Sequence, residues 1–371
     1  MMTQKALYLA GGGARGAYQA GVLKAIHQIL QVKKIPFDTL TGVSVGSINA
    51  VVLAEQADDF PNAIEKIENL WGEIHCQQIY KTSNYELSKS VLRNLSTLVI
   101  KQQKSGFLLD TSPLHQFLDD HVDFSRIEQH ITNGTLSALE VIASCYERQQ
   151  SHSFYMHHNH QFPDWQLPRH VGQRSLIQAE HVLASSALPL FFPTVPLAGL
   201  HYGDGSMGLI TPLRGPIRFN VDQIMILGTR EFPEGYTSSA PSTQVIPFAR
   251  VLATLLSNLF LDTLDRDIET VNRMNEIARM LSIWNKHRSP WRPISTLYLR
   301  PLQPISILAT KHYETMPALL RYMLNVLGSN KKSGDLLSFL LFEKEFTREL
   351  ITMGYDDTMK NTKEVEAFFA A

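Results

Sequence analysis

The sequence has little of what a disulfide-rich or nucleic-acid-binding protein needs. Only two of its 371 residues are cysteines, Cys76 and Cys145, which is too few for a disulfide framework. We expect both to pack as small apolar side chains. The chain also has no charge excess, since 34 Lys and Arg residues oppose 35 Asp and Glu residues. Without a basic field to attract phosphates, no nucleic acid partner is expected.

Long apolar runs are absent as well. No run of about 18 apolar residues occurs, so no transmembrane helix is expected. The most apolar window, residues 188–200, is interrupted by Pro189, Pro193 and Pro196. Near the N-terminus, the apolar stretch 6–10 is too short for a signal-peptide core and lacks its basic flank. We therefore expect a cytoplasmic protein.

The N-terminal part of the chain alternates between predicted strands and helices. Apolar runs at 6–10 and 37–43 predict buried strands, and an apolar stripe with helical spacing predicts a helix over 17–30. Helices over 45–56 and 61–74 follow. This order predicts an α/β fold in which helices cover a mainly parallel sheet. Further strands are predicted at 139–143, 153–156, 195–202, 223–228 and 295–299.

The later part of the chain is rich in predicted helices. The segment 232–247, which contains Pro, Gly, Ser and Thr, is the clearest linker, and a long helix is predicted over 248–286. Because the strand at 295–299 is expected to return to the sheet, we place the first domain at residues 1–305 and a helical extension at 306–371. Helices in the extension are predicted at 312–327, 334–351 and 357–369. Earlier in the chain, residues 77–107 are predicted to be either a mobile cover over a site or a plain surface excursion.

The most informative motif is Gly-x-Ser-x-Gly at residues 42–46, between a predicted strand and a predicted helix. In a nucleophile elbow the turn is so tight that small residues must flank the serine, here Gly42 and Gly46. Ser44 then stands at the end of the strand, and the following helix directs its N-terminal amides at a developing oxyanion. Alone, the pattern also fits a glycine-rich turn without chemistry.

A second glycine-rich loop, Gly-Gly-Gly-Ala-Arg-Gly at 11–16, also lies between a strand and a helix. It contains the Gly-x-Gly-x-x-Gly of dinucleotide-binding proteins, which need an acidic residue at the end of the second strand. Asp38 lies at the beginning of that strand, whereas its end leads into Ser44. We therefore favour a loop whose amides converge with those after Ser44 on one oxyanion. Arg15 would add a charge there or brace the loop.

A serine nucleophile needs a base, and no histidine in this sequence fits that role well. In α/β-hydrolases the histidine follows the acid in the chain. Asp204 lies in a glycine-rich turn and is followed only by His287, at a predicted helix end, and His312, at a predicted helix start. His201 is a weaker candidate. The histidine cluster at 157–160 has no completing Cys or carboxylate pattern, so no metal site is predicted there.

Four ordered segments of this chain resemble the patatin-like phospholipase family. They are the loop at 11–16, the elbow at 42–46, an Ala-Ser-x-Ala-x-Pro segment at 184–189 and the Asp-Gly at 204–205. Small residues in the third segment would let the start of a helix pack closely beneath the site. The resemblance is strongest over residues 5–230. It departs at Ser206, which stands where the family prefers Gly or Ala.

The resemblance implies a three-layer α/β/α fold and a hydrolase of fatty-acyl esters in phospholipids or related lipids. It implies an acyl-enzyme on Ser44, Asp204 as the base of a dyad, no metal or other cofactor, and peripheral contact with a membrane. The implied site also includes the oxyanion residues Gly11, Gly12, Gly13 and Arg15 and the motif residues Gly16, Gly42, Gly46, Gly205 and Ser206. Two alternatives stay open: a lipid-binding or interaction protein with a vestigial site, and a nucleotide-dependent oxidoreductase built on residues 11–16.

Overall fold

The computed structural model describes residues 3–81, 107–231, 248–280, 292–326 and 334–370. The linker predicted at 232–247 lies outside these residues, as does most of the cover predicted at 77–107. Of that cover only the beginning is described, and it belongs to the short helix α4 (Cys76–Ile79).

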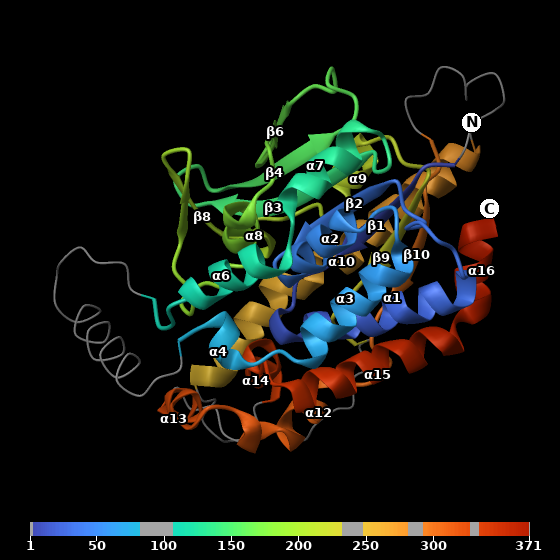
Figure 1. Ribbon diagram of the computed structural model, residues 1–371. Helices are drawn as coiled ribbons and strands as arrows, with labels where there is room; N and C mark the ends of the chain where they lie inside the picture. The colour runs from blue at the N-terminus through green and yellow to red at the C-terminus, as the bar shows by residue number, and fades with distance from the viewer. Residues whose placement is uncertain (1–2, 82–106, 232–247, 281–291, 327–333, 371) are drawn as a thin grey trace.

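A twisted ten-stranded sheet forms the middle of the molecule (Figure 1). Its main order is β10-β9-β1-β2-β3-β4-β6-β5, and the pairs from β10 to β3 are all parallel. The parallel strands are β10 (Ser295–Leu299), β9 (Gln223–Leu227), β1 (Lys5–Leu9), β2 (Thr39–Val43) and β3 (Ala138–Cys145). The mainly parallel sheet predicted from the order of elements is therefore confirmed, including the return of residues 295–299 to it.

Antiparallel pairs extend the sheet beyond β3. They involve β4 (Gln150–His157), β5 (Trp165–Leu167), β6 (His170–Arg174), β7 (Val195–Leu197) and β8 (Leu200–Asp204). The single strand predicted at 195–202 is wrong, because Ala198 and Gly199 both have positive φ and turn the chain into the β7–β8 hairpin. β8 then pairs with the end of β3, which brings Asp204 opposite Ala143.

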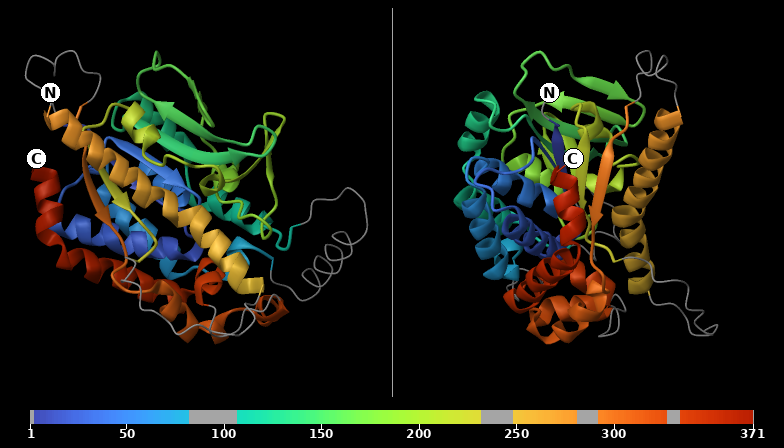
Figure 2. Two further views of the ribbon diagram at one scale, coloured as in Figure 1. Left: turned by 180° about the vertical axis from the view of Figure 1, so that it is seen from behind. Right: turned by 90° about the vertical axis from the view of Figure 1, so that its right-hand side faces the viewer.

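Helices cover both faces of the sheet, so the three-layer architecture is confirmed (Figure 2). One face carries α1 (Gly16–Leu30), α2 (Val45–Glu55) and α3 (Phe60–Gly72), and the long helix α10 (Phe248–Met280) crosses the other. Smaller helices are α6 (Ser112–His121), α7 (Phe124–Thr132), α8 (Ala179–Ser185) and α9 (Arg214–Arg218), and α7 packs beside α2. Alternation along β1 explains the layers, since Leu7 and Leu9 enter one core while Ala6 and Tyr8 enter the other.

The C-terminal helices pack on the same side as α1. They are α12 (Ile305–Lys311), α13 (Ala318–Val326), α14 (Gly334–Leu340), α15 (Lys344–Lys360) and α16 (Thr362–Ala370). α15 runs along α1 in both views, and Leu336, Phe346 and Leu350 share one hydrophobic core with the N-terminal helices (Figures 1 and 2). The division of the chain at residue 305 stays a prediction.

Two of the predicted C-terminal helices are interrupted in the structure. The helix predicted at 334–351 is wrong in extent, because α14 stops at Leu340 and α15 begins at Lys344. Tertiary bonds explain the break: the Tyr80 hydroxyl donates to the carbonyl of Leu340, and His75 forms a β-bridge with Glu343. The helix predicted at 357–369 likewise divides, since α15 ends at Lys360 and α16 begins at Thr362. The helix predicted at 312–327 begins only at Ala318, after the 3-10 turn Tyr313–Thr315.

Candidate functional site

Ser44 stands in a strained turn between β2 and α2. Its φ of 53° and ψ of −130° lie far from helical or extended values, which is the geometry of a nucleophile elbow. The flanking glycines are required by space: a Cβ on Gly42 would lie 2.4 Å from Ser47 Cα, and one on Gly46 would lie 2.1 Å from Leu9 O. The elbow predicted at 42–46 is therefore present in the structure.

Ser185 holds this elbow from a distant part of the chain. The backbone amide of Ser44 donates to Ser185 Oγ at 2.9 Å, and that hydroxyl donates to the carbonyl of Ile142 at 2.6 Å. Ser185 is fully buried at the last position of α8, so a helix ends at this segment instead of starting there. The small residues at 184–189 indicated close packing near the site, but the local sequence did not predict the hydrogen bond to Ser44.

We expect Ser185→Ala to slow turnover by about 100-fold, because a small displacement of a nucleophile costs about that much. The unpaired amide of Ser44 should also destabilise the fold by about 1–3 kcal/mol. The steady-state kcat and the Tm of the variant measure the two effects. The control is Ser137→Ala, just before the opposite end of β3. Equal effects of the two substitutions would deny Ser185 its positioning role.

The loop at 11–13 approaches Ser44 closely. A Cβ on Gly11 would lie 3.0 Å from Ser44 Cβ, and Thr229 Oγ1 donates to the carbonyl of Gly11. Gly12 has a φ of 155° and Gly13 a φ of 57°, both unfavourable for residues with side chains. Val45 is the first residue of α2, so its amide has no acceptor within the helix. The loop and the first residue of α2 thus both lie next to Ser44.

We expect Gly13→Ala to reduce turnover by about 100- to 1000-fold, the usual effect of losing one oxyanion donor. The new methyl would lie 2.1 Å from the carbonyl oxygen of Phe339, so the loop must shift. Gly134→Ala is a matched control, because Gly134 has a φ of 76° with nothing within 4 Å of the added Cβ. Initial rates are measured for both variants. Near-normal turnover of Gly13→Ala would mean that the loop serves packing and supplies no oxyanion donor.

Arg15 braces the loop against the C-terminal helices. Its side chain is 2% exposed, its Nε donates to Ser338 Oγ at 2.8 Å, and its guanidinium lies over the Phe339 ring. It also approaches Asp335 at 3.6 Å and donates to the carbonyl of Thr229 at 3.4 Å, so its contacts are with α14 and with the residues after β9. Burial lowers the pKa of Arg15, although the guanidinium stays charged. Of the two roles considered for Arg15, these contacts favour bracing over a direct charge on the oxyanion.

Asp204 lies at the end of β8 and is completely buried. Its Oδ1 accepts the amide hydrogen of Ser206 at 2.9 Å. Burial raises the pKa of Asp204 to about 6, while the Ser206 hydrogen bond and the nearby Ser44 hydroxyl oppose that rise. Ser44 is thus close enough to stabilise the carboxylate, but no contact of Oδ2 within the described residues has the geometry of a hydrogen bond. The structure brings the two predicted catalytic residues together without closing a bond between them.

The remaining motif residues pack tightly around this pair. Gly16 begins α1 against Val45, and a Cβ on Gly205 would lie 2.1 Å from Ile142 O. The Ser206 hydroxyl lies beside Gly11, where an added Cβ would be 2.9 Å from its oxygen. The serine at this position is accommodated without displacing the loop.

The described histidines considered as bases lie elsewhere. His201 is exposed and pairs with Glu147 at 2.7 Å, and His312 pairs with Glu349 at 3.0 Å. His287 lies outside the described residues. No group of three His, Cys, Asp or Glu side chains gathers in the described ranges to hold a metal ion. In the cluster at 157–160, His157 stacks on Phe162.

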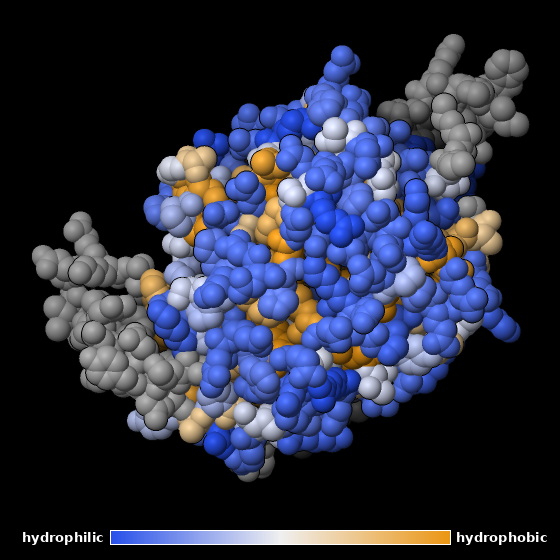
Figure 3. Space-filling view, in the orientation of Figure 1, coloured by the Kyte–Doolittle hydropathy of each residue, from blue (hydrophilic) through white to orange (hydrophobic). Residues whose placement is uncertain are grey.

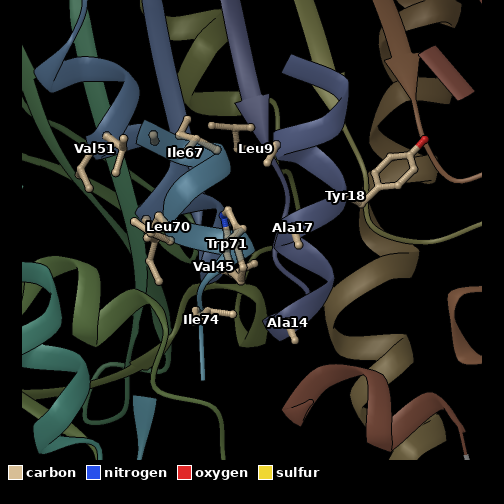
Figure 4. Close-up of a cluster of buried hydrophobic side chains, with 14 of the residues drawn as sticks. Leu9, Ala14, Ala17, Tyr18, Val45, Val51, Ile67, Leu70, Trp71 and Ile74 are labelled. Atoms are coloured by element: carbon tan, nitrogen blue, oxygen red, sulfur yellow. The ribbon is translucent and has the colours of Figure 1, made fainter. Parts of the chain in front are cut away.

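A buried network of polar side chains connects α1, α2 and α3 to the strand end that precedes the glycine loop at 11–13. Trp71 Nε1 donates to Asn49 Oδ1, and the Asn49 amide donates to Gln19 Oε1. The Gln19 amide in turn donates to the carbonyls of Ala10 and Leu227, at the ends of β1 and β9. Trp71 lies beside Val45 in the apolar cluster beneath the site (Figure 4). Sequence reasoning missed this network, since each member looks like an ordinary helix residue.

An apolar pocket adjoins Ser44. Its lining combines the elbow and α2 with residues from five other parts of the chain: Gly12, Gly13, Val45, Ile48, Ile79, Leu114, Ser186, Leu188, Phe192, Phe339 and Phe342. Tyr80 lies between Phe192 and Phe342, with ring centroids 6.1 and 6.3 Å away. The cavity is about 30 Å³, room for about two water molecules. A longer ligand therefore requires these side chains to move.

The fold and the site together define an α/β protein with a nucleophile elbow and a glycine-rich amide loop at the carboxyl end of a parallel sheet. The chain belongs to the patatin-like phospholipase family, whose model matches residues 7–217. The family predicted from the four motifs is thus confirmed.

Individual proteins are similar to this chain over limited lengths or at low identity. It is 44% identical over 55 residues to Lysophospholipase nte1 of Aspergillus terreus (strain NIH 2624 / FGSC A1156), covering 15% of this chain and 3% of that protein. The structure of VipD from Legionella pneumophila has a TM-score of 0.41 and 14% identity, covering 98% of this chain and 67% of that one. Human GIVD cytosolic phospholipase A2 has a TM-score of 0.44 and 11% identity, covering 99% and 60%. Since both scores are below 0.5, the fold assignment depends on this chain's own sheet and on the family match.

Proposed function

We propose that this protein is a serine acyl hydrolase that cleaves fatty-acyl esters of phospholipids or related lipids. The observation that carries the proposal is the strained Ser44 held beside the buried carboxylate of Asp204, with the glycine loop and the first residue of α2 next to it. Membership of the family supports a lipid acyl ester as the substrate.

In the proposed reaction, Ser44 Oγ attacks the ester carbonyl carbon and its proton passes to Asp204. Amides of Gly12, Gly13 and Val45 stabilise the tetrahedral oxyanion. The carbon–oxygen bond to the alcohol then breaks, and Asp204 returns its proton to that leaving group. Water attacks the acyl-enzyme next, giving its proton to Asp204, and collapse of the second intermediate releases the fatty acid and regenerates Ser44. No step needs a histidine.

The environment of Asp204 suits a base. A general base works best when its pKa lies near the operating pH, and burial raises the pKa of this carboxyl to about 6. At neutral pH the group is then mostly ionised yet more basic than an exposed aspartate. The raised pKa supports the dyad proposed for this site.

The acyl chain would occupy the apolar pocket beside Ser44. Leu188 lines that pocket, and Leu190, two residues on, is 55% exposed with a φ of 70°. We propose that this segment touches the membrane surface during turnover, so that contact is peripheral. None of the described helices is long and apolar enough to cross a bilayer. The face shown in Figure 3 is mostly hydrophilic, with apolar atoms at the left where the β7–β8 hairpin lies.

A turnover assay with chromogenic acyl esters and with phospholipid vesicles tests the proposal. Saturable release of product that depends on Ser44 supports a hydrolase. Lipid binding without turnover would favour the vestigial-site alternative, which keeps this fold. The nucleotide-dependent alternative lacks support, because the acidic residue it needs is missing: Asp38 instead accepts the amide hydrogen of Lys5 at the opposite end of the sheet.

We expect Phe342→Ala to shift the preference of the enzyme toward longer acyl chains. The Phe342 ring stacks on Trp71 at 6.4 Å and closes the pocket, so its removal extends the space available to the chain. Each further buried methylene is worth about 0.8 kcal/mol, or about fourfold in kcat/KM. The measurement is kcat/KM for a homologous series of p-nitrophenyl esters.

Loss of packing must be separated from this effect, because Phe→Ala in a core costs about 3–5 kcal/mol. Phe342→Leu is the milder variant, and Phe219→Leu is the control, since Phe219 is buried in the core on the other side of the sheet. If both Phe342 variants keep the chain-length preference of the wild type, Phe342 does not limit the length of the acyl site.

A further inference from the structure

A second cavity lies beyond the Asp204 turn, outside the proposed catalytic site. It has a volume of about 60 Å³ and is lined on its polar side by Ser151, Arg169, His170, Gly208, Thr211 and Arg214. This volume corresponds to about four or five water-sized groups, which is the size of a phosphate. The site lies where β4 and β6 begin, beside the end of β3.

The polar groups in this wall lack partners. Ser151 Oγ and His170 Nδ1 are buried and have no hydrogen-bond partner within the described residues. Ser151 is 1% exposed and His170 3% exposed. Buried polar atoms without partners are uncommon in folded proteins, because each costs free energy. Both residues line this cavity, so a polar ligand there suits its wall better than an apolar one.

The charge around this cavity is positive. Arg169 and Arg214 both line it, and in the described part of the chain neither guanidinium forms a hydrogen bond or ion pair. Arg214 acts electrostatically on Asp267, whose Oδ2 accepts the amide hydrogen of Leu213. Arg218 lies nearby, over the Trp165 ring. Burial lowers the pKa of His170, and the charges of Arg214 and Arg218 lower it further. Cations thus outnumber the carboxylates around the cavity.

We propose that this cavity binds a phosphate group, held by the guanidinium groups of Arg169 and Arg214 and by the Ser151 hydroxyl. Guanidinium groups bind phosphate through paired, charge-assisted hydrogen bonds, and they match its geometry better than an ammonium does. The ligand is either free phosphate or the phosphomonoester of a lipid headgroup.

The site also connects to the turn that carries Asp204. The amide of Gly208, in the cavity wall, donates to Ser144 Oγ at 3.1 Å, and this hydroxyl donates to the carbonyl of Gly205 at 3.3 Å. Gly205 directly follows the proposed base. A bound phosphate would therefore touch the same turn that orients Asp204.

Calorimetric titration of the full chain with inorganic phosphate tests the proposal. We expect saturable binding at one site and a rise in Tm with phosphate, with no such rise in chloride at equal ionic strength. Arg214→Gln and Arg169→Asn should each weaken the affinity by about tenfold or more, since bonds to charged groups are worth about that much. Asn tolerates the positive φ of 59° at position 169, which is exposed, so this variant should fold. Arg126→Gln, at a half-buried arginine on α7 that pairs with Asp58 away from the cavity, is the control of equal charge.

Vesicles distinguish the two sources of phosphate. If the ligand is a lipid headgroup, phosphatidylcholine vesicles with added phosphatidic acid should capture the protein, and free phosphate and both variants should reduce capture. If the protein binds phosphate but is not captured by these vesicles, its ligand is a soluble phosphate and not a lipid headgroup. The proposal is overturned if neither phosphate nor phosphatidic acid binds, or if both arginine variants bind like the wild type. None of these outcomes depends on ester hydrolysis, so the proposed activity is tested separately.

Discussion

Ser44→Ala is expected to abolish ester hydrolysis while leaving the fold intact. The substitution removes a single hydroxyl, so it leaves almost no cavity and does not disturb the bond from the Ser44 amide to Ser185. Without a nucleophile the covalent route is lost, and loss of such a residue in serine hydrolases costs on the order of 10⁴-fold or more. The comparison needs kcat for wild type and variant, together with circular dichroism and the Tm.

Ser206→Ala is the matched control for this variant. It removes the hydroxyl of a second buried serine close to the site, and it introduces a residue that the family prefers at this position. We expect it to retain most of the activity. Wild-type turnover by Ser44→Ala would end the claim that Ser44 is the nucleophile, whatever the control shows.

Asp204→Asn is expected to lose activity about as fully as Ser44→Ala. The amide keeps the shape of the side chain and still accepts the Ser206 amide hydrogen, but it does not take a proton from Ser44. Single substitutions of His201 and His312 should have little effect, because both lie in exposed ion pairs. A folded but inactive variant of either histidine would replace the dyad with a triad.

The same variant should be at least as stable as the wild type. The pKa of Asp204 is raised to about 6 in the folded protein, above its unfolded value. The carboxyl therefore contributes stability only when protonated, and this contribution is lost as the pH rises through about 6. At neutral pH the buried carboxylate costs on the order of 3 kcal/mol, which Asn avoids. A Tm of Asp204→Asn well below that of the wild type would contradict this account of the site.

A pH profile of the wild type at one temperature does not identify the base, so it must be measured at several temperatures. Activity should fall below about pH 6 as Asp204 takes up a proton, but an imidazole with a pKa near 6.5 would give a similar limb. Temperature separates the two bases, because ionisation of a carboxyl has almost no enthalpy whereas that of imidazole is strongly endothermic. We expect the acid limb of kcat to keep its position on warming.

Local sequence signals predicted the elements that carry the site. The strand periodicity of β1 and β2 and the glycines at 11–13, 42 and 46 are short-range features, so they placed both loops at one end of the sheet. The partners of these loops were not predictable in the same way. Ser185 bonds to Ser44 across 141 residues and Arg15 bonds to Ser338 across 323, and neither pairing leaves a periodic or compositional trace.

The edge of the sheet was the least predictable part of the fold. β5 has three residues and β7 three, lengths at which alternation cannot be distinguished from chance. The contribution to the pocket of Phe339 in α14 and of Phe342 just after it was missed for another reason, since both look like ordinary core residues of a C-terminal helix. Only the packing of that helix on the glycine loop reveals their second role.

Covalent labelling tests the central claim most directly. The wild-type chain is treated with a fluorophosphonate probe, digested, and the adduct is located by mass spectrometry. We predict one phosphonylated residue, Ser44, with no labelling in Ser44→Ala and much slower labelling in Asp204→Asn. An adduct on another residue, or an active enzyme that takes up no probe, would contradict a mechanism built on Ser44.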